Sequence, residues 1–64
     1  MTADQLVSTQ LTNVPRNRIW ITNGDLYAGW LYQSRETDRM KRREVVDVNA
    51  RLVNGEIVYG VVVK

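Results

Sequence analysis

Apolar and polar residues alternate along the C-terminal part of the chain with a period of two, which is typical of a β-strand. The clearest run lies within 44–53, and a second apolar run follows over 56–63. Asn54 and Gly55 separate the runs, and both residues tolerate the positive φ that a two-residue hairpin turn requires. We therefore predict a β-hairpin of strands 44–53 and 56–63. Its expected apolar pairs are Leu52 with Ile57, Ala50 with Tyr59, Val48 with Val61, and Val46 with Val63.

The stretch RIWITNGDLYAGWL, residues 18–31, has the same plan: Asn-Gly, an acidic residue, and a glycine five positions after the first one. It predicts another hairpin, with strands over 18–23 and 25–33 and with Asn23 and Gly24 as its turn. Residues that lie opposite each other share a face of the sheet. The expected faces are Ile19, Ile21, Leu26 and Ala28 on one side, and Arg18, Trp20, Tyr27 and Leu31 on the other.

The N-terminal segment 2–11 contains no glycine or proline and carries Leu6 and Leu11, so we predict a short helix there, with Thr2 capping its first turn. The second glycine of each hairpin is expected to mark a bulge or a strong bend of its strand. The predicted fold is mainly β, in a single domain over 1–64. It is a short helix followed by two Asn-Gly hairpins that form a strongly bent antiparallel sheet or a small barrel.

Size and composition set limits on stability and location. A domain of 64 residues buries only about 60% of the surface that its unfolded chain exposes, so its stability is small. The chain has neither cysteine nor histidine, which leaves assembly as the usual way to gain stability, and we expect a homo-oligomer. No segment approaches the roughly 18 apolar residues of a membrane span, and no signal-peptide pattern is present. We expect a cytoplasmic protein without membrane contact.

Catalytic chemistry has little support in this composition. Without histidine or cysteine, neither an imidazole-activated nucleophile nor a thiolate site can be built. The paired glycines lack the following Lys-Ser or Lys-Thr of a phosphate-binding loop. Several carboxylates lie among arginines, which lower the pKa of a carboxyl group and do not raise it toward that of an acid catalyst. We therefore expect no enzyme, no cofactor and no metal site.

The segment SRETDRMKRR, residues 34–43, concentrates positive charge, with five basic residues against two acidic ones. On a connection between two hairpins, these side chains could follow a phosphate backbone. A solvated loop or helical turn, whose carboxylates pair locally with the basic side chains, would have the same composition. Both interpretations remain open. The candidate phosphate contacts are Arg35, Arg39, Lys41, Arg42 and Arg43.

The aromatic face of the first hairpin is the second candidate site. Trp20 is expected directly opposite Tyr27, with Arg18 beside them. Bases of single-stranded nucleic acid stack on exposed aromatic rings, at about 1–3 kcal/mol each. The same rings would alternatively stabilise the hairpin as a cross-strand pair, or serve core and subunit contacts.

The first half of the chain resembles the Sm-like family, which includes the Hfq-like RNA chaperones of bacteria. The resemblance lies in a short helix, a strand, an Asn-Gly turn and a second strand with a glycine. The matching positions are Ile19, Ile21, Asn23, Gly24, Leu26, Gly29 and Leu31. The resemblance implies a strongly bent, five-stranded SH3/Sm-like barrel that assembles into a ring and binds single-stranded RNA. The family's closing Tyr-Lys-His stretch has no counterpart here, since Tyr59 is followed by Gly60.

These observations lead to one main hypothesis and one alternative. The main hypothesis is a non-catalytic, homo-oligomeric regulator or chaperone that binds nucleic acid, with single-stranded RNA or DNA favoured. The alternative is a protein–protein interaction module, such as a small phage or plasmid-type inhibitor or assembly factor, which binds its partner through a free sheet edge or the aromatic face. Binding to nucleic acids across a salt series distinguishes the two.

Overall fold

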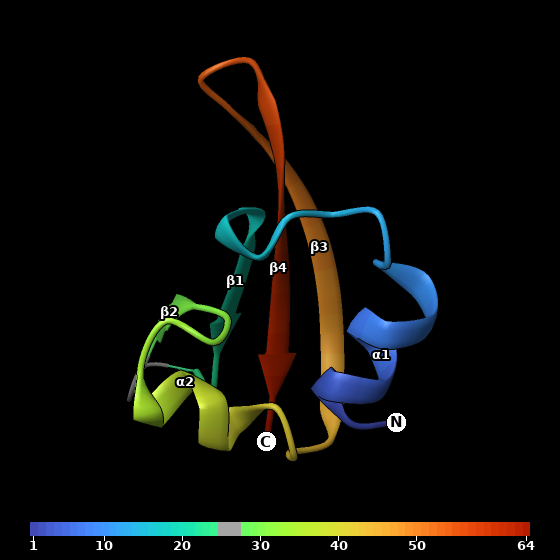
Figure 1. The fold of residues 1–64 in the computed structure, drawn as a ribbon, viewed down its shortest axis with the longest axis vertical. Coiled ribbons are helices and arrows are strands. Elements are labelled where there is room, and N and C mark those ends of the chain that lie inside the picture. Colours follow the sequence, from blue (N-terminus) through green and yellow to red (C-terminus); the bar gives the residue numbers. More distant parts are fainter. Residues whose placement is uncertain (25–27) are drawn as a thin grey trace.

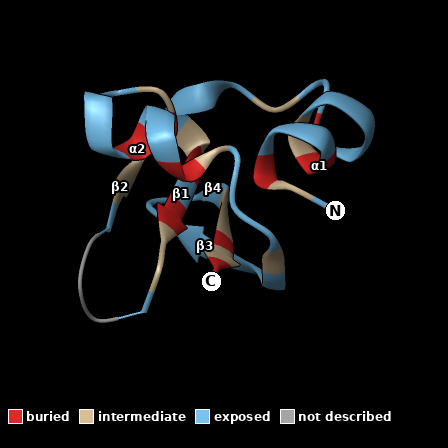
Figure 2. Cartoon of the chain, turned by 90° about the horizontal axis from the view of Figure 1, so that it is seen from below, coloured by how far each residue is buried: buried red, intermediate tan, exposed pale blue. Residues whose placement is uncertain are grey.

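The computed structural model describes residues 1–24 and 28–64 of the chain. Two short helices lie on one side of a single four-stranded sheet (Figure 1 and Figure 2). Strands form the largest part of the structure and follow an N-terminal helix, as the sequence predicts. In chain order the elements are α1 (Ala3–Gln10), the 3-10 turn η1 (Arg16–Arg18), β1 (Ile19–Thr22), β2 (Ala28–Trp30), α2 (Arg35–Met40), β3 (Val45–Val53) and β4 (Glu56–Val63).

Helix α1 begins at the predicted cap. The hydroxyl of Thr2 accepts a hydrogen bond from the Gln5 N–H at 3.2 Å, and the Gln5 side chain accepts one from the Thr2 N–H at 2.9 Å. This reciprocal capping box satisfies two backbone donors that the first turn would otherwise leave unpaired. The N–H of Ala3 donates to the carbonyl of Arg43 at 3.1 Å, so the start of α1 is fastened to the segment before β3.

The order of strands in the sheet is β2-β1-β4-β3, with β1 and β4 parallel and both outer pairs antiparallel. The prediction of an all-antiparallel sheet is therefore wrong. Parallel pairing sets Ile21 of β1 opposite Val61 of β4, and both side chains are fully buried. Burial of apolar area favours this arrangement, because it brings the two most apolar strand centres together. Helix α2 and its flanking turns carry the chain from β2 at one edge to β3 at the other (Figure 1).

The expected barrel is also not found. Within the described residues, β2 and β3 are the two edges of the sheet and do not pair with each other, so the sheet stays open. The helices cover one face only, and the core lies between them and the sheet (Figure 2). No helix of the described chain is long and apolar enough to cross a membrane. The core residues are Ala3, Leu6, Leu11, Ile19, Ile21, Leu31, Met40, Val61 and Val63.

The first hairpin has a different register from the predicted one. Thr22 lies opposite Ala28, whereas the two-residue turn would have placed Ile19 there. The connection between the paired residues is therefore 23–27, and residues 25–27, which the sequence assigns to the second strand, lie outside the described part of the chain. The observed pairs are Trp20 with Trp30, Ile21 with Gly29, and Thr22 with Ala28.

The observed register and the predicted register differ by an odd number of residues. The side chains of β2 therefore point to the opposite face of the sheet from the one predicted. Leu31 was expected beside Trp20 but is buried in the core at 2% exposure. Trp30 instead lies beside Trp20 on the face away from the helices. Burying a leucine side chain contributes about 1.5–3 kcal/mol. The observed register buries Leu31, whereas a two-residue Asn-Gly turn would place it on the open face.

The second hairpin turns at Asn54 and Gly55, whose φ values of 51° and 80° suit a type I′ turn. From the turn back to Asp47, the residues of β3 have the partners that the sequence predicts, with Val48 opposite Val61 among them. The ladder changes at its base. There Val45, and not Val46, lies opposite Val63, because the register shifts between Val45 and Asp47.

The two strand glycines are not at that shift, so of the predicted bulge or strong bend the bulge is not found at either glycine. Gly29 lies opposite Ile21 and Gly60 opposite Asn49, both within regular ladders. The register shift in the described strands lies at Val46 instead. An extra residue there keeps Val63 in the core while Val46 is 55% exposed.

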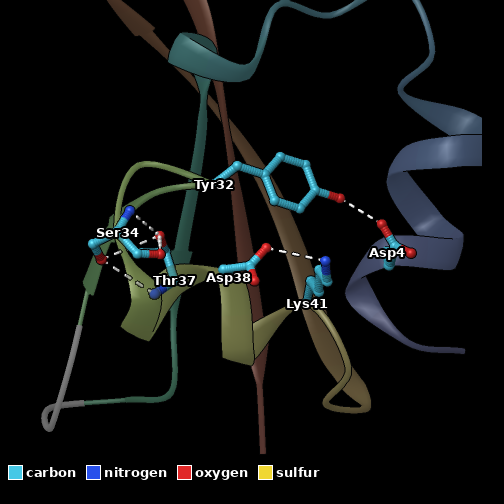
Figure 3. A network of polar contacts seen from close by, with 6 residues as sticks. All are labelled: Asp4, Tyr32, Ser34, Thr37, Asp38 and Lys41. Carbon is cyan, nitrogen blue, oxygen red and sulfur yellow. Dashed lines mark hydrogen bonds and ion pairs between the residues drawn. The ribbon is translucent and has the colours of Figure 1, made fainter.

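Helix α2 was only one of several possibilities for the basic segment, and its capping explains why it forms. The Ser34 hydroxyl accepts from the Thr37 N–H at 3.3 Å, and the Thr37 hydroxyl accepts from the Ser34 N–H at 3.0 Å (Figure 3). Thr37 is 1% exposed and Ser34 is half-buried, so this cap is largely shielded from solvent. Met40, one turn later, enters the core, and the charged residues of α2 are therefore left on its outer side.

Tyr32 connects the β2–α2 turn to α1. Its hydroxyl donates to a carboxylate oxygen of Asp4 at 2.5 Å, and the Arg16 guanidinium lies 4.6 Å from the centre of its ring (Figure 3 shows the first contact). Partial burial, followed by the hydrogen bond to Asp4, raises the pKa of Tyr32 to about 12. Tyr32 has a positive φ of 62°, which lets the chain reverse directly after β2.

Candidate functional site

The face of the sheet that the helices leave uncovered carries a shallow groove. Side chains alternate along a strand, so when Ile19 and Ile21 face the helices, Trp20 and Thr22 point the other way. The groove has a volume of about 520 Å³. It runs across all four strands, and its main lining residues are Trp20, Trp30, Asn49, Arg51, Val58 and Gly60.

The two tryptophans form one wall of this groove. They are directly opposite in the β1–β2 ladder, and their ring centres are 5.0 Å apart with the planes at 87°, an edge-to-face contact. Such pairs contribute about 0.5–1.5 kcal/mol beyond their buried area, so each ring fixes the position of the other. Trp20 nevertheless remains 38% exposed. A large aromatic ring that is both fixed and exposed is a ready stacking surface for a planar ligand.

Gly60 lies at the floor of the groove, next to the wall that the tryptophans form. It lies beside Trp20 in the parallel ladder and opposite Asn49 in the antiparallel one. A Cβ atom at this position would lie 2.6 Å from the Asn49 side-chain oxygen, which is closer than such contacts occur. The absence of a side chain at Gly60 therefore allows the Asn49 amide to lie across the strand and keeps the groove open next to Trp20.

A second concavity continues from the tryptophans around the β2 edge. Its lining includes Trp20 and Trp30 at one end and Ser34 and Thr37 of the α2 N-terminal turn at the other. The two concavities share both tryptophans. Arg35 directly follows Ser34 and is exposed. A chain-like ligand that lies on the tryptophans could thus continue over this edge toward α2.

Three of the candidate basic residues have partners within the protein. Arg18 forms an ion pair with Glu56 at 2.5 Å. Lys41 pairs with Asp38 at 3.0 Å (Figure 3), and an Arg43 guanidinium nitrogen donates to the carbonyl of Lys64 at 2.8 Å. Within the basic segment, Lys41 is thus the residue that pairs with a carboxylate in the described structure, so the local ion pairing of the second interpretation is only partial.

The other three basic candidates, Arg35, Arg39 and Arg42, are exposed, and within the described chain none of them has a carboxylate at ion-pair distance. Glu44, which directly follows the basic segment, accepts a hydrogen bond from the amino group of Met1 at 2.7 Å. That contact lowers the pKa of the Glu44 carboxyl group. Free positive charge is therefore concentrated on α2 and the turn after it.

The predicted site residues are not all in one place. Trp20 lies on the open face, whereas Arg35 and Arg39 belong to α2, which packs on the covered face and borders only the second concavity, with its first turn (Figure 2). Tyr27, expected as the partner of Trp20, lies outside the described residues. Among the described residues, no three acidic, histidine or cysteine side chains come together as a metal site.

Sequence reasoning missed Trp30, Asn49 and Gly60 as groove residues. Trp30 was missed because the tight-turn register paired Trp20 with Tyr27. For Asn49 and Gly60 a sequence signal was present, since the predicted second hairpin places these two residues opposite each other. That this pair borders the tryptophans follows only from the pairing of β4 with β1.

No protein-family model, no curated protein and no solved structure matches this chain. The site is therefore interpreted from its own geometry. Fold and site together define a small protein with an open mixed sheet, two helices on one face and an aromatic groove on the other.

Proposed function

We propose that this protein binds single-stranded RNA or DNA on the uncovered face of its sheet, as a non-catalytic regulator or chaperone. The observation that carries the proposal is the Trp20 ring, which is fixed edge-to-face by Trp30 and remains exposed above a groove. Stacking on such a ring tolerates any base, because every base has an aromatic face. A double helix does not present its bases in this way, so single strands are preferred.

The phosphate contacts in this proposal come from α2. Arg35 and Arg39 lie one turn apart on the same helix and are exposed without ion pairs among the described residues. They stand beyond the second concavity, which leads from the tryptophans to the start of α2. Bases on the open face and phosphates at the β2 edge then belong to one continuous strand of nucleic acid. Arg18, Lys41 and Arg43 contribute less, because they already have partners.

Trp20→Ala is expected to weaken the binding of a short single-stranded RNA or DNA by about 5- to 150-fold, because one base stack is worth about 1–3 kcal/mol. The chain has two tryptophans and both line the groove. Quenching of the intrinsic fluorescence during a titration therefore reports occupancy of this site, and Trp30 remains as the reporter in the variant.

Trp20→Phe is the control, since it keeps an aromatic face and should retain most of the affinity, and circular dichroism checks that both variants are folded. Equal affinities of the native protein and folded Trp20→Ala would rule out stacking on this ring. Absence of binding to any nucleic acid at low salt would favour the protein-interaction alternative.

Arg35→Gln is expected to reduce the steepness with which affinity falls with salt, by about 0.7 in the slope of log K against log salt, because one phosphate contact to a single strand is lost. Arg42→Gln is the matched control. It removes the same charge from the same basic segment but beyond the far end of α2, and it should leave the slope almost unchanged. Equal changes in both variants would indicate a general effect of net charge and contradict a defined track.

A further inference from the structure

Strand β3 is a long free edge of the sheet. It runs from Val45 to Val53 and pairs only with β4 among the described strands, although the Val45 N–H at its start donates to the Met1 carbonyl at 2.9 Å. At about 3.3 Å per residue its nine residues extend for about 30 Å. Every residue from Val46 to Val53 is exposed. An edge of this length is a template for pairing with another strand, and it contains no proline or lysine that would prevent such pairing.

The turn geometry tells which backbone groups of β3 face outward. In a two-residue turn, the residues that flank it, Val53 and Glu56, form a hydrogen-bonded pair, and the pairs then alternate along an antiparallel ladder. The backbone groups of Asp47, Asn49 and Arg51 thus point toward β4. Those of Val48, Ala50 and Leu52 point away from the sheet, which agrees with the Val48 N–H donating to the Asp47 carboxylate at 2.9 Å. Pairing with a second strand replaces this local contact, because the Val48 N–H then donates to the partner strand and the Asp47 carboxylate turns to an arginine.

The charged residues of β3 are placed symmetrically about Asn49, so two β3 strands that run in opposite directions present opposite charges to each other. Its single acidic residue, Asp47, and its single basic residue, Arg51, are each two positions from this centre and share the open face. Antiparallel pairing of two such strands forms two opposite-charge pairs across the edge. The facing residues next to the centre are then Asp47 with Arg51 and Val48 with Ala50, each pair occurring twice.

We propose that the protein is a homodimer in which the β3 strands of two copies pair antiparallel about Asn49. The symmetry is two-fold, so the same surface serves both copies. The centre falls on Asn49, whose backbone faces β4, and the outward-facing groups of Val48 in one copy then meet those of Ala50 in the second. The two four-stranded sheets join into one sheet of eight strands.

The exposed apolar side chains of the projecting hairpin support this partner. Leu52 is 75% and Val48 40% exposed, and both lie on the same face of β3 (Figure 1 shows the hairpin reaching beyond the helices). In the dimer this row of apolar side chains continues directly into the same row of the second copy. Ile57 of β4, 52% exposed and opposite Leu52, adjoins it. A second copy thus covers apolar surface that a single small domain leaves in water.

The dimer also places the two aromatic grooves on one side. The two-fold axis of an antiparallel strand pair is perpendicular to the sheet, so the open faces of both copies point the same way. Arg51, at the rim of each groove, then meets Asp47 of the second copy. This dimer does not depend on what the grooves bind, and its test requires no nucleic acid.

Charge reversal provides the test, with the oligomeric state measured by sedimentation over a range of concentrations. The native protein is expected to be a dimer. Asp47→Arg and Arg51→Asp each set two like-charge pairs across the edge and should raise the dissociation constant by about ten- to a hundredfold. Mixing these two variants restores both opposite-charge pairs, so a mixed dimer should form at concentrations where each variant alone is a monomer.

Two further variants complete the experiment. The double variant Asp47→Arg/Arg51→Asp exchanges the charges within one chain and should dimerise like the native protein. Glu36→Arg, on exposed α2, is the matched control and should leave the dimer unchanged. A monomeric native protein at high concentration would overturn the proposal. So would a dimer that survives both single reversals, or a mixture of the two variants that stays monomeric.

Discussion

Ile21→Ala is expected to lower the free energy of unfolding by about 2–5 kcal/mol, the range for truncating a buried isoleucine. Ile21 has no exposed surface and lies between Gly29 of β2 and Val61 of β4 at the centre of the sheet. A chain of 64 residues has a total stability of only about 3–10 kcal/mol. This single truncation therefore removes a large fraction of the free energy of unfolding. If the native protein's stability lies in the lower part of its range, the variant is unfolded.

Urea unfolding followed by circular dichroism measures this loss. Ile57→Ala is the matched control, because it makes the same chemical change at a side chain that is 52% exposed. Measured at a concentration where the chain is a monomer, it should cost much less than the buried truncation. Similar losses for the two variants would show that Ile21 does not lie at the centre of the core.

Leu31→Ala is expected to have a comparable effect, about 2–5 kcal/mol of unfolding free energy, because Leu31 is 2% exposed. Its N–H also donates to the carbonyl of Ile19 at 2.9 Å, which holds the end of β2 in register with β1. This variant tests the register of the first hairpin directly. In the tight-turn register Leu31 would share the open face with Trp20, and its truncation would change stability little.

Thermal unfolding is a suitable measurement, since a loss of 1 kcal/mol lowers the melting temperature by about 4–8 °C for a domain of this size. Leu52→Ala serves as the reference, because that leucine is 75% exposed. Under conditions where the chain is monomeric, we expect a large decrease in melting temperature for Leu31→Ala and a small one for Leu52→Ala. The reverse order would contradict the observed register.

The elements that could be predicted are those whose signals are local. Thr2 caps α1 through an N–H only three residues away, and Asn54-Gly55 turns the chain with two adjacent positive φ values. Each signal and its effect lie within a few residues, so no distant contact is needed to interpret them. The same holds for the position of Trp20 on the face opposite Ile19 and Ile21, which follows from strand alternation.

The parts that could not be predicted depend on contacts between distant segments. Asn23-Gly24 has the same local signal as the second turn, yet the pairing of Trp20 with Trp30 and the burial of Leu31 correspond to a longer connection. The composition of 34–43 suits a loop, and α2 forms because Thr37 and Met40 find buried positions against the sheet. Packing in these cases outweighs the local preference, which is worth about 1 kcal/mol or less.

The sequence by itself determined that this chain is mainly β, which segments become α1, β3 and β4, and that β3 carries opposite charges placed symmetrically about Asn49. Only the tertiary structure decided that β4 inserts beside β1 in parallel, so that Gly60 borders Trp20 and β3 becomes a free edge. The physical reason is that hydrogen bonding and alternation specify a strand and its hairpin partner. Which hairpins then lie side by side depends on how the most apolar surface is buried.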